Sequence, residues 1–190
     1  MSLHTDAIAT LSALPPNPLR DRFLDHLAAH PDGAYRSCRP DHLTASVLVL
    51  SADHRQVLLT LHAKARQWFQ LGGHCEPGDQ TLASAALREA TEESGLTGLA
   101  LHPTPIHLDE HAVPFCRSAD RVTAARNEHA AYRDRVTHHL DVRFLAIAGP
   151  ETAHEVSAES LDVRWWPVDA LPGQDLSVST LVAAALDVVR

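Results

Sequence analysis

The chain has 190 residues, a formal net charge of −8 and a hydrophobic content of 45%. This length is typical of a single domain with a substantial core. The acidic balance argues against a general nucleic-acid binder and against a protein that adheres to membranes through charge, so we expect neither kind of partner.

The sequence carries no sign of a membrane-spanning or secreted protein. No apolar run approaches the roughly 20 residues that span a bilayer, and the first residues lack the basic and then apolar layout of a signal peptide. The three cysteines, Cys38, Cys75 and Cys116, are an odd number without close spacing. We therefore expect a reduced, cytoplasmic protein in which Cys75 is a small buried side chain rather than a reactive thiol.

Residues 5–30 are predicted to form two helices. The apolar stripe of the first helix stops at Pro15, because proline cannot continue a helix. Asn17 is suited to cap the second helix, with Pro18 at its first position. The residues expected to face the core from these two helices are Ile8, Leu11, Leu14, Leu19, Phe23 and Leu27.

Short strands are predicted after the helical region. Residues 45–50 and 56–61 form two apolar runs joined by a turn at residues 51–54. A third short strand at residues 68–71 ends at a pair of glycines. The later elements expected are a helix at residues 81–94, strands at residues 139–148 and 163–166, and a helix at residues 176–189.

Strands and helices interleave, which favours an α/β fold with a mixed sheet. We expect residues 1–40 to be a helical extension packed on a main domain of residues 41–190. Residues 102–114 are punctuated by prolines and offer Ile106 and Leu108 as candidate strand positions. The polar residues 116–137 are interpreted as a long loop, a feature that often has a functional role.

The stretch at residues 72–96 carries the strongest chemical signal. A loop rich in turn residues precedes the helix, on which Glu89, Glu92 and Glu93 fall within an arc of about 100°. Such a face can be a solvated acidic surface. It can also hold a divalent cation, because the charge of the cation offsets the repulsion between the carboxylates.

The position of the carboxylates favours a metal site. Glu92 and Glu93 lie just before Gly95, where the helix macrodipole disfavours negative charge. The glycine-rich loop would bring bare backbone carbonyls beside the same face. The apolar positions expected to pack on the sheet, leaving the carboxylate face free, are Ala83, Leu87 and Ala90.

Residues 73–96 resemble the signature of the Nudix hydrolases, G-x5-E-x7-R-E-U-x-E-E-x-G-U, where U is a bulky aliphatic residue. Asp79 stands where the pattern has glutamate, and eight residues rather than seven separate it from Arg88. Ala90 occupies one bulky aliphatic position. The positions that match are Arg88, Glu89, Glu92, Glu93, Gly95 and Leu96, and the similarity extends over roughly residues 43–189.

This resemblance implies an α/β/α sandwich and hydrolysis of a phosphoanhydride bond in a nucleoside diphosphate derivative, with Mg²⁺ or Mn²⁺ as cofactor. A homodimer is in keeping with the family. Glu89 and Glu93 match the principal metal ligands, and the backbone carbonyl of Gly73 matches a further contact. Glu92 matches another ligand or the proton acceptor. Arg88 matches a residue that orients the carboxylates through charge-assisted hydrogen bonds.

The expected chemistry needs a cation, because an acidic site would otherwise repel a diphosphate. The metal polarises the phosphoryl oxygens and lowers the pKa of a bound water, and a carboxylate accepts the proton. Glu92 is the first candidate for that carboxylate, with Glu128 in the long loop as the second. The candidate substrate contacts are Arg66, Trp68, His74 and Glu128.

Several of these side chains have simpler interpretations. Trp68 or Phe69 could stack on a nucleobase, but packing of both side chains against their neighbours is the favoured interpretation. Arg66 could meet a distal phosphate or be solvated. His107 and His111 are four residues apart, but the prolines around them disfavour a helix, and the sequence has no H-E-x-x-H or C-x-x-C motif. A metal site built from any of the fourteen histidines is therefore not expected.

Two other functions compete with hydrolysis. One is a Nudix-like module that binds nucleotides for regulation without turnover, which would not need the carboxylate cluster. The other is isopentenyl diphosphate isomerase, which shares the fold. The sequence has no counterpart of the characteristic cysteine-containing motif of that isomerase, so we rank it last.

Overall fold

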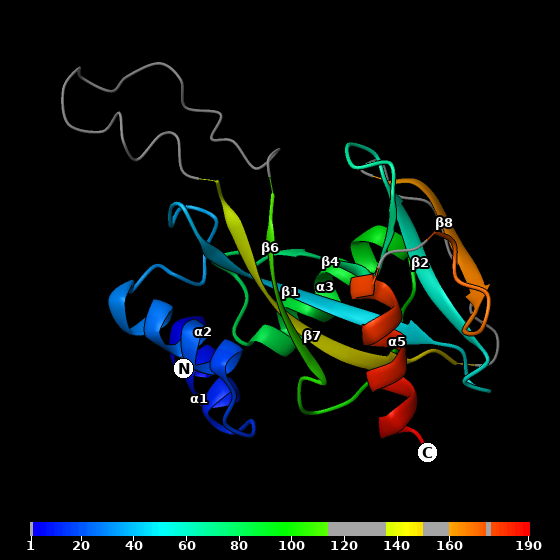
Figure 1. Ribbon diagram of the computed structural model, residues 1–190, viewed down its shortest axis with the longest axis horizontal. Coiled ribbons are helices and arrows are strands. Elements are labelled where there is room, and N and C mark those ends of the chain that lie inside the picture. The colour runs from blue at the N-terminus through cyan, green and yellow to red at the C-terminus, as the bar shows by residue number, and fades with distance from the viewer. Residues whose placement is uncertain (1, 114–135, 150–159, 174–175) are drawn as a thin grey trace.

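The computed structural model describes residues 2–113, 136–149, 160–173 and 176–190 (Figure 1). Within these residues, no helix combines the length and the apolar character needed to cross a bilayer. The expected loop at residues 116–137 lies almost entirely outside the described residues, as does Cys116.

Two helices begin the chain, α1 (Leu3–Ser12) and α2 (Pro18–Ala29). The side chain of Asn17 accepts hydrogen bonds from the N–H groups of Leu19 and Arg20, and Pro18 occupies the first turn, which confirms the expected cap. Both helices bury apolar side chains in the core that they share with α3. These are Leu3, Ala7, Leu11, Phe23 and Leu27, with Ile8, Leu14 and Leu19 partly buried.

The described strands form one mixed sheet of eight strands. β1 (His42–Leu50) pairs with β2 (Gln56–His62) and β4 (Leu71–His74) in antiparallel fashion and with β7 (His138–Ile147) in parallel fashion. β2 also pairs with β3 (Trp68–Phe69) and β8 (Ser160–Pro167). β7 also pairs with β5 (Ala100–Leu101) and β6 (His107–Ala112).

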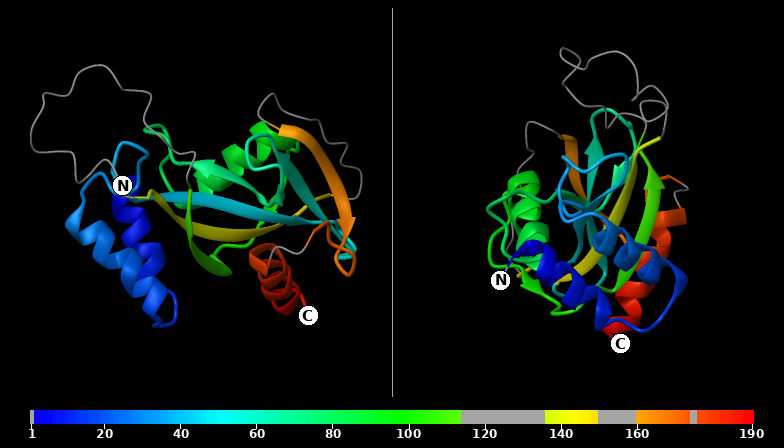
Figure 2. Two further views of the ribbon diagram at one scale, coloured as in Figure 1. Left: turned by 45° about the horizontal axis from the view of Figure 1, so that its top comes forward. Right: turned by 90° about the vertical axis from the view of Figure 1, so that its left-hand side faces the viewer.

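Helices α3 (Leu82–Ser94) and α5 (Leu176–Val188) cover opposite faces of this sheet (Figures 1 and 2). Alternate residues of β1 point to the two sides. Val47 and Val49 join the core under α3, whereas Leu48 and Leu50 join the core under α5. The sandwich of a helix, a mixed sheet and a helix is therefore confirmed, together with the helices at the N-terminus.

The structure corrects the expected path of the chain before α3. The single strand expected at residues 68–71 is two strands, since β3 pairs with β2 while β4 crosses to β1. The two-residue strand β5 was not expected. Leu87 is only half-buried, so the expected packing face was wrong in part. The core face consists of Leu82, Ala85, Ala86 and Ala90, whose small alanines let α3 lie close to the sheet.

Candidate functional site

Helix α3 is fixed at both ends. The hydroxyl of Thr81 accepts a hydrogen bond from the N–H of Ser84, and the hydroxyl of Ser84 accepts one from the N–H of Thr81. The carboxylate of Asp6 in α1 accepts a hydrogen bond from the N–H of Leu82 at 2.8 Å. Gly95 ends the helix with a left-handed φ of 70°. These contacts fix the rotation of α3 about its own axis and therefore the direction in which its charged face points.

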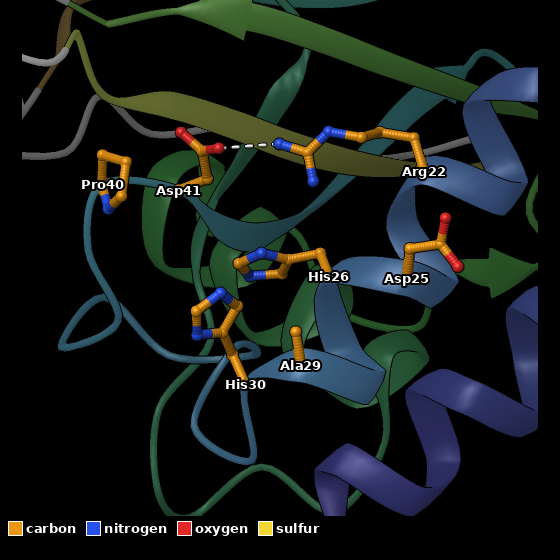
Figure 3. A pocket seen from close by; sticks show the side chains of 7 residues that line it. All are labelled: Arg22, Asp25, His26, Ala29, His30, Pro40 and Asp41. Carbon is orange, nitrogen blue, oxygen red and sulfur yellow. Dashed lines mark hydrogen bonds and ion pairs between the residues drawn. The ribbon is translucent and has the colours of Figure 1, made fainter.

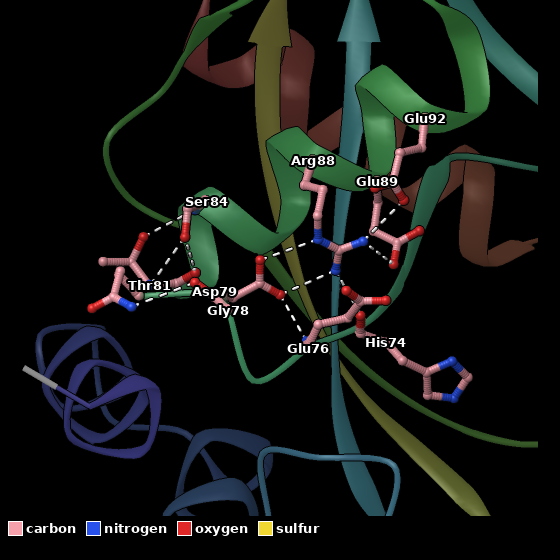
Figure 4. A network of polar contacts seen from close by, with 10 residues as sticks. His74, Glu76, Gly78, Asp79, Thr81, Ser84, Arg88, Glu89 and Glu92 are labelled. Carbon is pink, nitrogen blue, oxygen red and sulfur yellow. Dashed lines mark hydrogen bonds and ion pairs between the residues drawn. The ribbon is translucent and has the colours of Figure 1, made fainter.

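Arg88 lies at the centre of that face (Figure 4). Its guanidinium donates to both oxygens of Asp79, at 3.1 and 3.0 Å. Nη1 donates to Glu89 at 3.1 Å and to Glu92 at 3.0 Å, and Nη2 also donates to the carbonyl oxygen of His74 at 2.9 Å. The hydrogen bond to Asp79, more than any other contact, holds the pKa of Arg88 above its usual value.

Asp79 occupies the position at which the sequence departs from the signature, and the structure gives it a defined partner. Its side chain is 6% exposed. Besides the two hydrogen bonds from Arg88, it accepts a hydrogen bond from the N–H of Glu76 at 2.7 Å. Burial raises the pKa of this carboxyl, but the hydrogen bonds from Arg88 and Glu76 outweigh burial and leave the pKa lowered. The extra loop residue therefore does not prevent an acidic side chain from pairing with Arg88.

Strand β4 brings bare backbone against the glutamates of α3. A Cβ at Gly73 would lie 2.7 Å from Oε2 of Glu89, so any other residue at this position would require the carboxylate to shift. The N–H of Gly72 donates to Oε2 of Glu93 at 2.9 Å. The side chain of Glu92 is 59% exposed, compared with 17% for Glu89. Glu89 and Glu93 thus lie against the glycines, and Glu92 faces solvent.

The oxygen donors suit a hard cation, yet the side chains contact Arg88 and the backbone. Glu89 and Glu92 both accept hydrogen bonds from Nη1 of Arg88. These glutamates do not form a closely spaced group of ligands. Among the described residues, they belong to none of the groups of three or more His, Cys, Asp or Glu whose ligand atoms lie within 4.8 Å of one another. A cation at this face would therefore replace part of the contact with Arg88.

Three of the four expected substrate contacts lie among the described residues. Arg66 is exposed with a φ of 57°, and Glu128 lies outside the described residues. Trp68 packs edge-on against Trp166, with 5.2 Å between ring centroids, and lies 6.0 Å from the guanidinium carbon of Arg164. His74 points away from α3 (Figure 4). The role of these four residues in substrate binding therefore stays a prediction.

Cys75 is 4% exposed, and burial raises the pKa of its thiol to about 12. The thiol is therefore protonated near neutral pH, as expected of a structural cysteine. Burial likewise raises the pKa of Cys38 to about 11. Both side chains are free thiols.

A buried polar network on the α5 side of the sheet was missed from the sequence. Asp141 is 1% exposed and accepts hydrogen bonds from Thr44 at 2.9 Å, Ser46 at 2.7 Å and Arg143 at 2.7 Å. Arg143, itself 2% exposed, also donates to Asp109 at 2.9 Å. The alternation of polar residues 139, 141 and 143 with apolar neighbours was the available signal, because period two places them on one face.

The same face gathers the histidines of three strands. The imidazoles of His42, His74 and His139 lie 4.9 to 5.1 Å apart, centroid to centroid. Burial is the largest cause that lowers their pKa values, to about 4, about 3 and about 2 respectively. His107 and His111 lie on strand β6, which confirms that they share no helix.

A surface pocket lies elsewhere, between α2 and the segment that enters β1 (Figure 3). Asp41 in its wall bonds to Arg22 at 2.7 Å and to the imidazole of His138 at 3.2 Å. No residue of α3 lines this pocket, so it is separate from the carboxylates. Its lining residues are Arg22, Asp25, His26, Ala29, His30, Pro40 and Asp41.

Comparison with known proteins places this geometry in context. The family model described as NUDIX domain matches residues 40–182. A search of curated proteins finds no match to the chain.

Solved structures share the fold. A hydrolase of the NUDIX family from Clostridium perfringens superimposes with a TM-score of 0.57 at 22% identity, over 78% of this chain and 98% of that one. The NUDIX domain of Shewanella oneidensis NrtR, crystallised with ADP ribose, gives a TM-score of 0.57 at 16% identity, over 87% and 97%. A Caenorhabditis elegans Ap4A hydrolase gives 0.53 at 16%, over 77% and 96%.

Proposed function

This chain belongs to the NUDIX family, and on that premise we propose that it is a metal-dependent hydrolase that cleaves a phosphoanhydride bond in a nucleoside diphosphate derivative. Family membership makes it a Nudix hydrolase. The substrate, the metal and the roles of single residues are the parts we propose.

One observation carries the proposal. Arg88 joins the loop carboxylate Asp79, the carbonyl of His74 in β4 and the helix carboxylates of Glu89 and Glu92 in a single set of hydrogen bonds. A solvated acidic surface would not need a half-buried arginine held by a nearly buried aspartate. The arrangement fits a site in which Arg88 orients carboxylates for work on another ligand.

The donor set fits Mg²⁺ or Mn²⁺, because these cations prefer carboxylate and carbonyl oxygens. Glu89, Glu93 and the carbonyl of Gly73 would hold the ion, since both side chains lie against the glycines. When bound, the ion would polarise the phosphoryl oxygens and lower the pKa of a water molecule.

We assign the exposed carboxylate of Glu92 as the proton acceptor. Its exposure leaves it free to reach a water molecule in the open side of the site. Its contact with Arg88, four residues earlier on the helix, is made through Nη1, the same atom that donates to Glu89. Catalysis would then combine Glu92, Glu93 and Arg88.

The substrate class is supported by what the similar structures bind or hydrolyse. The Shewanella domain holds ADP ribose, the nematode enzyme hydrolyses Ap4A, and an Escherichia coli neighbour at 20% identity and a TM-score of 0.53 is a dihydroneopterin triphosphate pyrophosphohydrolase. All three ligands contain a phosphoanhydride. A small molecule with this linkage is therefore the partner that we propose.

The test is a hydrolysis screen with Mg²⁺ and, separately, Mn²⁺. The panel contains nucleoside triphosphates, ADP-ribose, dinucleoside polyphosphates and NADH. We expect release of phosphate, pyrophosphate or a nucleoside monophosphate from at least one compound. Glu93→Gln should lower kcat/KM at least about 100-fold with an unchanged melting temperature. Glu110→Gln on β6 is the matched control and should keep full activity. Full activity of Glu93→Gln would refute the assigned site.

A nucleotide-binding module without turnover is the second candidate. It takes its support from the Shewanella NUDIX domain, which was crystallised with ADP ribose. Tight binding of a panel member without any hydrolysis, in either metal, would favour this candidate over the enzyme.

We also propose a cellular location and an oligomeric state for the enzyme. The free thiols of Cys38 and Cys75 support a reducing, cytoplasmic location. A homodimer, in keeping with the family, can be tested by sedimentation velocity, in which a single species at monomer mass over a range of concentrations would contradict it.

A further inference from the structure

We propose that His42, His74 and His139 form a zinc site, distinct in chemistry and in position from the carboxylates of α3. Their ligand atoms all lie within 4.8 Å of one another, and of the three such groups among the described residues this is the one made of imidazoles alone. Nitrogen ligands favour Zn²⁺ over Mg²⁺, which prefers oxygen. The proposal goes beyond hydrolysis and does not depend on it.

The sheet register places the three imidazoles on one face. His42 of β1 and His139 of β7 are direct partners in the parallel pair, so their side chains point the same way. His74 of β4 is the partner of Thr44, which shares a face with His42 because the two are separated by one residue. Adjacent strands therefore hold the three rings side by side without a contribution from a loop.

The spacing of the rings matches a metal site. A tetrahedral Zn²⁺ with Zn–N distances of about 2.0–2.1 Å places the centroids of its imidazole ligands about 5 Å apart. The observed distances are 5.1 Å for His42 and His74, 5.0 Å for His42 and His139, and 4.9 Å for His74 and His139. The three pairs are nearly equal, as expected of rings arranged around a common centre.

The hydrogen bonding of His42 and His139 is compatible with metal binding. Nδ1 of His42 lies 3.2 Å from the carbonyl oxygen of Cys38. A carbonyl only accepts, so Nδ1 carries the proton and Nε2 has the lone pair, the tautomer typical of a metal ligand. Nε2 of His139 is buried without a hydrogen-bond partner among the described residues, which is costly unless another group binds it.

The surroundings determine how the site would be completed. Arg36 and Arg39 lie close enough to lower the pKa values of His42 and His74. Burial, the larger cause, keeps the rings neutral, which is the form that binds metal, whereas the positive charge of the two arginines opposes a proton and a cation alike. His111 lies 5.5 Å from His139 but bonds to Asp109 at 2.7 Å. Three histidine ligands leave the fourth tetrahedral position to water or another ligand.

The test measures zinc binding rather than activity. Protein stripped with EDTA is titrated with Zn²⁺ by calorimetry in the presence of excess Mg²⁺, and Co²⁺ serves as a spectroscopic probe of tetrahedral nitrogen coordination. We expect about one equivalent of Zn²⁺ per chain, a rise in melting temperature on binding, and visible Co²⁺ absorption.

Substitutions identify the ligands. His74→Asn and His139→Asn, at half-buried positions, should each weaken Zn²⁺ binding at least about tenfold. His54→Asn is the matched control, because His54 lies in the β1–β2 turn with a φ of 59° that asparagine tolerates. It should bind Zn²⁺ as the wild type does, and so should Glu93→Gln.

Three results would overturn the zinc site. They are wild-type protein that binds no Zn²⁺, histidine variants that are folded by circular dichroism and bind with wild-type affinity, and loss of binding in Glu93→Gln instead. None of these results bears on whether the carboxylate site hydrolyses nucleotides, since the hydrolysis screen is read in Mg²⁺ or Mn²⁺ alone.

Discussion

Two sets of proposed metal ligands meet at strand β4. The oxygen set is Glu89, Glu93 and the carbonyl of Gly73, and the nitrogen set is the three histidines of the proposed zinc site. Gly73 lies under the carboxylate of Glu89 on the α3 side, whereas the next residue, His74, points to the opposite face and meets the other histidines. The oxygen set comes from the end of β4 and the helix that follows it, so it is contiguous in sequence. The nitrogen set comes from three strands, so it exists only when the sheet has its register.

The charged residues that surround the two sets differ as well. The carboxylates are organised by the half-buried cation of Arg88, which is 22% exposed. The histidines share their face with the fully buried ion pair of Arg143 and Asp141. Charge near solvent is screened and can rearrange, whereas a buried pair is rigid and costly to break. Substitutions should therefore act mainly on activity in the first region and mainly on folding in the second.

Arg143→Met should have the largest effect. It would leave Asp141 buried and charged without its cation, which typically costs about 3–5 kcal/mol of stability. The free energy of unfolding in urea measures this loss. The paired variant Arg143→Met with Asp141→Leu should recover much of it. Equal stability of the single variant and the wild type would show that the network does not support this face.

Arg88→Lys should reduce kcat/KM by about 10- to 100-fold, because lysine keeps the charge but loses the fork to Asp79 and the shared contact with Glu89 and Glu92. Arg22→Lys, at a more exposed ion pair on α2, is the matched control. Wild-type activity of Arg88→Lys would mean that charge alone, and not geometry, is what Arg88 contributes.

The positions of the proposed oxygen ligands could be predicted from the sequence for a physical reason. Arg88 and the three glutamates lie within two turns of one helix, so spacing along the chain fixes their positions in space. The caps at Asn17 and Gly95 were also predictable, because capping depends on residues next to the helix end.

The histidine set could not be found in this way. Residues 42, 74 and 139 are far apart in sequence, and a shift of one residue in either strand pair would send one ring to the other face. The same limit explains why the strand at residues 68–71 was not expected to divide, since pairing with β2 or β1 is decided by tertiary contacts. The proposed division at residues 40 and 41 stays a prediction.

Gly73→Ala should have an intermediate effect on activity and a small one on stability. The added methyl would lie 2.7 Å from the carboxylate of Glu89, a flexible group that can move aside. We expect a loss of about tenfold in kcat/KM with Mg²⁺, because the displaced carboxylate would hold the ion less well. Gly78→Ala, with nothing within 4 Å of the new Cβ, is the control and should keep its activity.

Asp79→Asn should have the smallest effect. We expect it to lower the free energy of unfolding by about 1–2 kcal/mol at neutral pH, because a neutral amide still fills the position. The pKa of Asp79 is lower in the folded protein than the value of about 3.9 in an unfolded chain. The carboxylate therefore stabilises the fold fully above pH 4, and this contribution is lost as the pH falls through the folded pKa. We expect the melting temperature, measured between pH 3 and pH 7, to fall less steeply at the acid end in the variant than in the wild type.

The most direct test of the account is anomalous diffraction from crystals soaked with both Mn²⁺ and Zn²⁺, with data collected at the absorption edge of each metal. We predict Mn²⁺ beside Glu89, Glu93 and the carbonyl of Gly73, and Zn²⁺ among His42, His74 and His139 on the other side of β4. Both metals at one of these positions, or zinc peaks only at other surface residues, would contradict the account.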